Sequence, residues 1–60
     1  METVETMVQD LIDNLREALA DARKHDTGNN AAGTRVRKAM QACKTEAQAI
    51  RVRVQDDKNR

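Results

Sequence analysis

The sequence lacks proline and aromatic residues, and it contains a single cysteine. Without aromatic side chains, a folded core has to be built from smaller aliphatic groups. One cysteine cannot form an internal disulfide, and no spacing of cysteine and histidine resembles a metal site. With no proline and two glycines, long helices are favoured over sheets. The composition predicts an all-α protein with no metal and no cofactor.

Long apolar runs and a catalytic constellation are also missing. No segment is apolar over the length that a signal peptide or a membrane span requires, which predicts a cytoplasmic protein with a reduced thiol. A nucleophilic Cys43 would need an adjacent base, but the single histidine, His25, lies on the other side of the central turn. We therefore expect no catalytic residue, no enzymatic activity and no small-molecule substrate.

The length of the chain limits how stable a single subunit can be. Sixty residues form at most one domain, and a chain of this size buries only about 60% of its unfolded surface. Disulfides and metals, which stabilise many small folds, are excluded here, so oligomerisation is the remaining means. The sequence predicts a homodimer or a higher homo-oligomer.

The formal net charge of +1 conceals an asymmetry between the two halves. Residues 1–27 carry seven acids against three bases, a net charge of −4, whereas residues 28–60 carry eight bases against three acids, a net charge of +5. Such an asymmetry suggests an anionic partner for the basic half. The other explanation is that the two halves neutralise each other in an antiparallel hairpin, and composition alone favours it.

Apolar residues in the first half recur at alternating spacings of four and three, which is typical of a heptad a/d stripe. They are Val4, Val8, Leu11, Leu15, Ala18 and Ala22. Met7, Ile12 and Leu19 widen the stripe beyond what one neighbouring helix covers, as in a bundle. Thr3 is a suitable N-cap, and the basic residues 23–25 lie at the helix end where cations are favoured. The pattern predicts a helix from about residue 3 to 26.

Gly28 and the two asparagines after it form the strong turn signal of the chain, at residues 27–30. A second a/d stripe follows, made by Val36, Met40, Cys43, Ala47, Ile50 and Val54. It predicts a helix from about residue 30 to 57, in which Cys43 is a small buried hydrophobe. The expected fold is an antiparallel helical hairpin that assembles into a four-helix bundle by oligomerisation, with coiled-coil packing.

Basic side chains of the second helix are the candidate binding residues. Four of them are spaced seven apart and form one stripe, Arg37, Lys44, Arg51 and Lys58. None has an acid three or four positions away in its own helix, and Arg35 and Lys38 also lack a local acidic partner. Three cations in the opening turns oppose the helix dipole, a conflict that a bound anion would relieve. Acids of the first helix are the alternative partners.

The start of the second helix has almost no side-chain bulk at Ala31, Ala32 and Gly33. Another backbone can therefore approach closely at this point. The neighbour is either the partner helix or a phosphate that reaches free N–H groups at Asn30, Ala31 and Ala32.

The stretch 28–41, Gly-Asn-Asn-Ala-Ala-Gly-Thr-Arg-Val-Arg-Lys-Ala-Met-Gln, resembles the core motif of the Chlamydia-type, linker-histone-like bacterial histones. The resemblance continues through 47–51, 54–55 and 58–59 and covers essentially the whole chain. It is to the short members of the family, which lack the long Lys- and Ala-rich tail. It implies DNA binding and condensation of the bacterial chromosome in the nucleoid, with Arg35, Arg37 and Lys38 as the basic motif residues.

The expected function is sequence-independent binding of double-stranded DNA by a homo-oligomeric, nucleoid architectural protein. Arginine and lysine side chains would contact phosphates, and repetition of the weak basic stripe would supply affinity. The candidate phosphate-binding residues are Arg35, Arg37, Lys38, Lys44, Arg51 and Lys58, with the helix-start backbone of Asn30, Ala31 and Ala32. The alternative is a helical oligomerisation or protein-interaction module that does not bind DNA.

Overall fold

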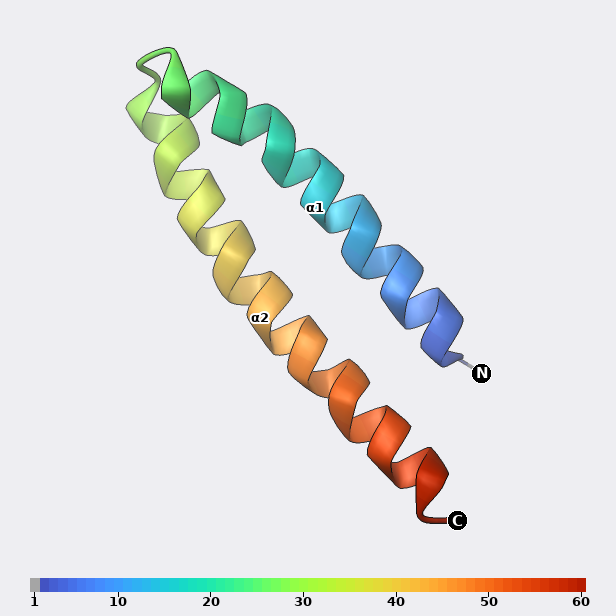
Figure 1. Cartoon of the computed structure of the whole chain (residues 1–60). Helices are drawn as coiled ribbons and strands as arrows, with labels where there is room; N and C mark the ends of the chain where they lie inside the picture. The colour runs from blue at the N-terminus through green and yellow to red at the C-terminus, as the bar shows by residue number, and fades with distance from the viewer. Residues whose placement is uncertain (1) are drawn as a thin grey trace.

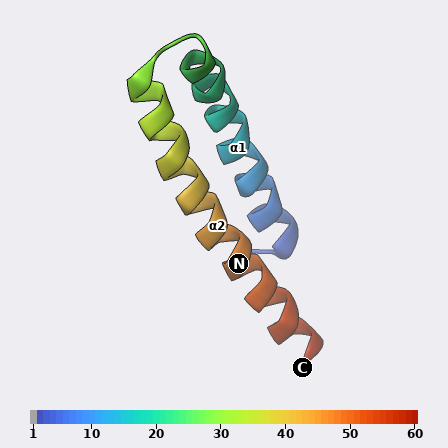
Figure 2. The same ribbon diagram turned by 60° about the vertical axis from the view of Figure 1, so that its left-hand side comes forward.

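The computed structural model describes residues 2–60 as two antiparallel helices joined by a tight turn (Figure 1). Helix α1 spans Val4–Asp26 and helix α2 spans Asn30–Lys58, and residues 2–60 contain no strand. The hairpin is a rod of 49 × 15 × 14 Å. Because α2 is the longer helix, its C-terminal end continues past the first residues of α1 (Figure 2). The all-helical hairpin predicted from the sequence is confirmed.

The turn is closed by backbone hydrogen bonds at the end of α1. The N–H of Gly28 donates to the carbonyl oxygen of His25 at 2.9 Å, and the N–H of Asn29 donates to that of Lys24 at 3.0 Å. This pair of bonds is the Schellman motif. Gly28 has a φ of +104°, a left-handed conformation that residues with a Cβ rarely adopt. Glycine at this position therefore allows the chain to reverse within three residues.

Side-chain caps fix where each helix begins. The Oγ1 atom of Thr3 accepts a hydrogen bond from the N–H of Thr6 at 3.1 Å, and α1 starts at the next residue after this cap. The Oδ1 atom of Asn29 accepts a bond from the N–H of Ala32 at 3.0 Å at the start of α2. Each cap satisfies an N–H group that has no partner within its helix.

The two helices meet through small side chains. The buried residues are Ala18, Ala32 and Cys43, and Ala32 has no exposed surface. Near the turn, the ring of His25 occupies the space that a Cβ at Gly33 would need. Half-buried aliphatic residues surround these contacts: Val4, Met7, Leu11, Val36 and Ile50. The core within one hairpin is consequently very small, although Cys43 has the buried position that the sequence predicted.

The contact between the helices differs from the predicted a/d stripes. Leu15 and Met40 were expected in the contact, but each is 42% exposed. Met7, which was expected beside the stripe, and Ala39, which lies outside it, are both half-buried. The physical reason is that each apolar stripe is wider than one helix can cover. The hairpin places the smallest residues at the contact and leaves larger ones outside.

Residues that come four positions or one position after the contact residues form an exposed apolar surface. In an antiparallel pair of helices, these positions on both helices lie on the same side of the contact. We call this surface the apolar face, and it comprises Val8, Ile12, Leu15, Leu19, Met40 and Val54, all exposed. Between its ends α1 contributes no charged side chain to this face. A single hairpin therefore leaves a continuous apolar surface in contact with water.

Candidate nucleic-acid interface

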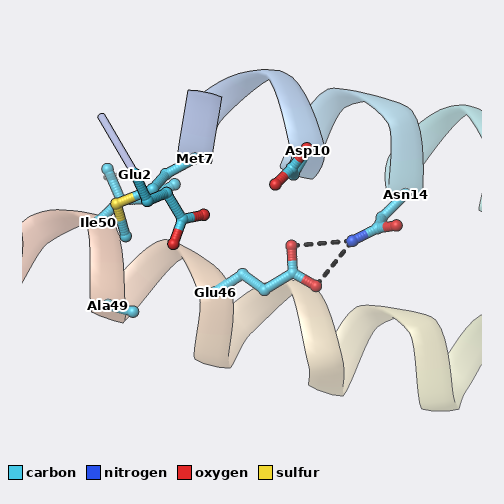
Figure 3. A pocket seen from close by; sticks show the side chains of 7 residues that line it. All are labelled: Glu2, Met7, Asp10, Asn14, Glu46, Ala49 and Ile50. Atoms are coloured by element: carbon cyan, nitrogen blue, oxygen red, sulfur yellow. Dashed lines mark hydrogen bonds between the residues drawn. The ribbon is translucent and has the colours of Figure 1, made fainter. Parts of the chain in front are cut away.

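The side of the hairpin opposite the apolar face is acidic. Figure 3 shows Asn14 of α1 bridging to Glu46 of α2, with its Nδ2 atom 2.8 and 2.9 Å from the two carboxylate oxygens. This bridge borders an open hollow of about 350 Å³. Four more carboxylates line this hollow and the next one towards the turn: Glu2, Asp10, Glu17 and Asp21. Such a surface repels phosphate, so an anion has to bind elsewhere on the hairpin.

Arg35, one of the candidate phosphate-binding residues, forms an ion pair with an acid of α1. Its Nε atom lies 3.0 Å from Oδ1 of Asp21 across the hairpin. The sequence left open whether acids of the first helix would provide such partners, and for Arg35 the antiparallel arrangement does so. The Arg35 side chain is 50% exposed, and that of Asp21 is 24% exposed. Arg35 therefore lies on the acidic side of the hairpin with an acidic partner already in place.

The four-residue stripe along α2 is exposed over its whole length. Within residues 2–60, none of Arg37, Lys44, Arg51 and Lys58 forms an ion pair. Arg51 donates only to a neutral partner, Oε1 of Gln48, at 3.3 Å. The neighbouring Lys38 is also exposed and outside the ion pairs of this part of the chain. We call the four heptad-spaced residues the basic stripe.

The basic stripe borders the apolar face. Its first members lie three positions before Met40, Ala47 and Val54, and residues three apart are neighbours on a helix surface. By contrast, three basic residues elsewhere on the hairpin are paired with acids. Arg53 and Arg60 share Asp57, with nitrogen to Oδ1 distances of 3.3 and 2.9 Å, and Arg16 lies 3.8 Å from Asp13. The basic stripe thus differs from these three residues in being exposed and outside the ion pairs of residues 2–60.

The backbone at the start of α2 is only partly free. The N–H of Ala32 already donates to Asn29, and the N–H of Gly33 donates to the carbonyl oxygen of Asn29 at 3.3 Å. Asn30 and Ala31 are exposed at the first positions of the helix. Of the three residues considered from the sequence, Ala32 is occupied by the cap, which leaves the other two as the accessible ones.

Two basic residues that the sequence reading assigned to the helix dipole lie beside the candidate site. Arg23 and Lys24 are in the last turn of α1, and the three-residue turn brings them next to the first turns of α2. Both are exposed, and neither forms an ion pair with a described residue. The short turn in the sequence could have indicated that Arg23 and Lys24 belong to the candidate site, because it places the end of one helix beside the start of the next.

Exposed, unpaired cations on a helical scaffold are typical of proteins that bind a polyanion. Among residues 2–60, no group of three metal-type ligands lies close enough together to hold an ion. The model of the family described as histone H1-like protein Hc1 matches residues 1–60. The chain therefore belongs to this family and is a DNA-binding nucleoid protein, in a family that packages DNA and is not enzymatic. The resemblance recognised in residues 28–41 is confirmed.

No curated protein and no solved structure matches the chain. Within the described residues, neither helix combines the length and apolarity that crossing a membrane requires.

Proposed function

We propose that this protein binds double-stranded DNA without sequence preference, through the phosphate backbone, and that it does so as a homo-oligomer. The observation that carries the proposal is the basic stripe, whose members are exposed, share one face of α2 and lack acidic partners among the described residues. Lysine and arginine neutralise phosphates whatever the adjacent base, and the release of condensed counterions supplies the free energy. Arg35 and Lys38 would add contacts beside the stripe.

A single hairpin can supply only a few of these contacts. Members of the basic stripe are separated by about 10 Å, since seven residues rise by that much along a helix. A duplex presents one phosphate charge per roughly 1.7 Å of its axis, so one subunit neutralises a small part of the DNA that it covers. Repetition of the stripe in an oligomer would raise the effective concentration of cations and hence the affinity.

The apolar face is the surface through which we propose that subunits associate. Residues 2–60 contain three buried residues, which form too small a core for an independent fold of this length. The apolar face has to be buried whenever the protein is folded, and a second copy of the chain is a partner that is always present. An apolar surface of this kind can pair with itself about a twofold axis. Two hairpins joined in this way form a four-helix bundle. The basic stripe borders the contact, where long side chains keep their charged ends in water.

A DNA-binding titration tests this function directly. The parent protein would be titrated into fluorescent duplexes of two unrelated sequences at several salt concentrations. We expect equal affinities for both sequences and a linear decrease of log affinity with log salt. In the variant Arg37→Gln/Lys38→Gln, the slope should become shallower by about 1.8, because each phosphate contact contributes about 0.9.

The matched control removes the same charge from cations that already have acidic partners. In Arg16→Gln/Arg60→Gln, the substituted residues pair with Asp13 and Asp57 in the parent, so the salt slope should change little. The rival function is a protein-interaction module, which the Arg35–Asp21 pair and the acidic side favour because they neutralise part of the surface. Absence of binding by the parent at low salt would refute the proposed function and leave that rival.

A further inference from the structure

Folding converts the charge difference between the two halves of the sequence into a difference between one end of the rod and the rest of it. We call residues 23–38 the hairpin tip. They contain five bases against one acid, Asp26, and carry a net charge of +4. We call the remaining described residues, 2–22 and 39–60, the shaft. They contain nine acids against six bases and carry a net charge of −3. The acids of α1 and the bases of α2 offset one another along the shaft, but not at the tip.

The cations of the tip come from both helices and surround it. Arg23 lies five positions after the buried Ala18, which directs it away from α2. Lys24 is three positions after Asp21 and thus lies on the side where Arg35 pairs with that acid. Arg37 is on the side of the apolar face. The last of the bases, residue 38, is eight residues into α2, so all five lie within about 12 Å of the end of a helix.

The tip is also accessible. Arg23, Lys24, Arg37 and Lys38 are exposed, and none is in an ion pair with a residue of 2–60. The turn residues 27–30 between them are uncharged and exposed. Nothing bulky or acidic in the turn therefore separates the cations of α1 from those of α2.

We propose that the duplex docks across the hairpin tip, with Arg23 and Lys24 binding phosphates together with Arg37 and Lys38, while the rod points away from the DNA. This inference rests on the proposed function and narrows its site. Of the basic stripe, Arg37 would bind phosphate at the tip, whereas Lys44, Arg51 and Lys58 along the rod would contribute less. The net negative shaft and its acidic side oppose a duplex that lies along the rod. Side-on binding would also bring DNA to the border of the apolar face, where a second copy would compete for space. Docking at the tip leaves that face free.

A pair of charge-matched variants tests the location. Arg23→Gln/Lys24→Gln removes two cations from the tip, and Lys44→Gln/Arg51→Gln removes two from the shaft. Titrations with a mixed-sequence 20-base-pair duplex should show a loss of about 60-fold for the tip variant at 0.1 M salt, the effect of two contacts at about 0.9 each. The shaft variant should lose much less. Circular dichroism and light scattering would establish that both variants keep the helicity and oligomer size of the parent.

Removal of a negative charge gives a second test that does not depend on a loss. Asp26→Asn raises the charge of the tip and should increase affinity and steepen the salt slope by up to about 0.9. Asp10→Asn makes the same change on the acidic side of the shaft and should have little effect.

Three results would overturn docking at the tip. If Lys44→Gln/Arg51→Gln loses as much affinity as the tip variant or more, the duplex lies along the rod, and the proposed function survives without this site. An unchanged affinity in Arg23→Gln/Lys24→Gln, or a larger gain from Asp10→Asn than from Asp26→Asn, would have the same meaning. A parent protein that does not bind the duplex at low salt would refute the proposed function, and this inference with it.

Discussion

Leu15→Asp is the perturbation that best distinguishes a hairpin alone from a hairpin covered by a second copy. In one hairpin, Leu15 is 42% exposed and lies near the middle of the apolar face. An aspartate there could keep its carboxylate in water if the face were free. If a second subunit covers the face, the same carboxylate is buried without a partner.

The two cases differ in the expected free energy of unfolding. Fully burying a leucine side chain contributes about 1.5–3 kcal/mol, so the 42% of Leu15 that one hairpin leaves exposed is worth about 1 kcal/mol per subunit. Burial of an unpaired polar group adds a cost of several kcal/mol. The lower helix propensity of aspartate accounts for only about 0.5 kcal/mol. In a covered face the total exceeds the stability that a small domain can lose, and the variant should unfold.

Val52→Asp is the matched control for this experiment. Val52 is 49% exposed, and it lies two positions after Ile50, on a side of α2 that faces away from both α1 and the apolar face. Thermal unfolding followed by circular dichroism, with light scattering at micromolar concentration, would compare the two variants with the parent. We expect Leu15→Asp to abolish folding and assembly, and Val52→Asp to leave both close to the parent. A folded monomer in the parent, or equal small effects of the two substitutions, would refute the reasoning.

Two further predictions concern the interior of the hairpin. Gly33→Ala alone should bring little or no stabilisation because the new Cβ would collide with the His25 ring. In a His25→Ala background the same substitution should stabilise the fold by about 1 kcal/mol, which is the difference in helix propensity between glycine and alanine. Additive effects of the two substitutions in a double-mutant cycle of thermal unfolding would contradict this packing. Cys43→Ala should cost about 1 kcal/mol through lost packing of a buried group and leave DNA affinity per folded molecule unchanged; loss of binding by a folded, assembled variant would assign Cys43 a further role.

Much of the local structure was predictable from the sequence because it depends on neighbouring residues. The alternation of apolar residues at spacings of three and four indicated two helices, and Thr3 was identified as a cap from its position. Gly28 was expected in the turn, and its φ of +104° is the left-handed conformation that commonly ends a helix. These features follow from backbone geometry within a few residues of each position, so no tertiary contact is needed to determine them.

The choice of which apolar residues meet could not be read from the pattern. Both apolar stripes are wider than one helix, so several rotations of α1 against α2 fit the spacing equally well. Close approach through Ala18, Ala32 and Cys43 selects one rotation and leaves Leu15 and Met40 outside. The volumes of the side chains that meet across the contact decide which rotation is adopted. They depend on both helices together and not on the pattern within one helix.

The same distinction holds for the candidate site. The sequence by itself determined the family, the two helices and the basic stripe, because each depends on residue order and on spacing within one helix. Only the tertiary structure decided that Arg35 is paired with Asp21, whereas Arg23 and Lys24 are outside the ion pairs of residues 2–60 and lie beside the start of α2. The antiparallel arrangement offsets charge along the shaft and leaves it unbalanced at the tip. Which charges offset one another depends on the distances between side chains of α1 and α2, and residue order alone does not specify these distances.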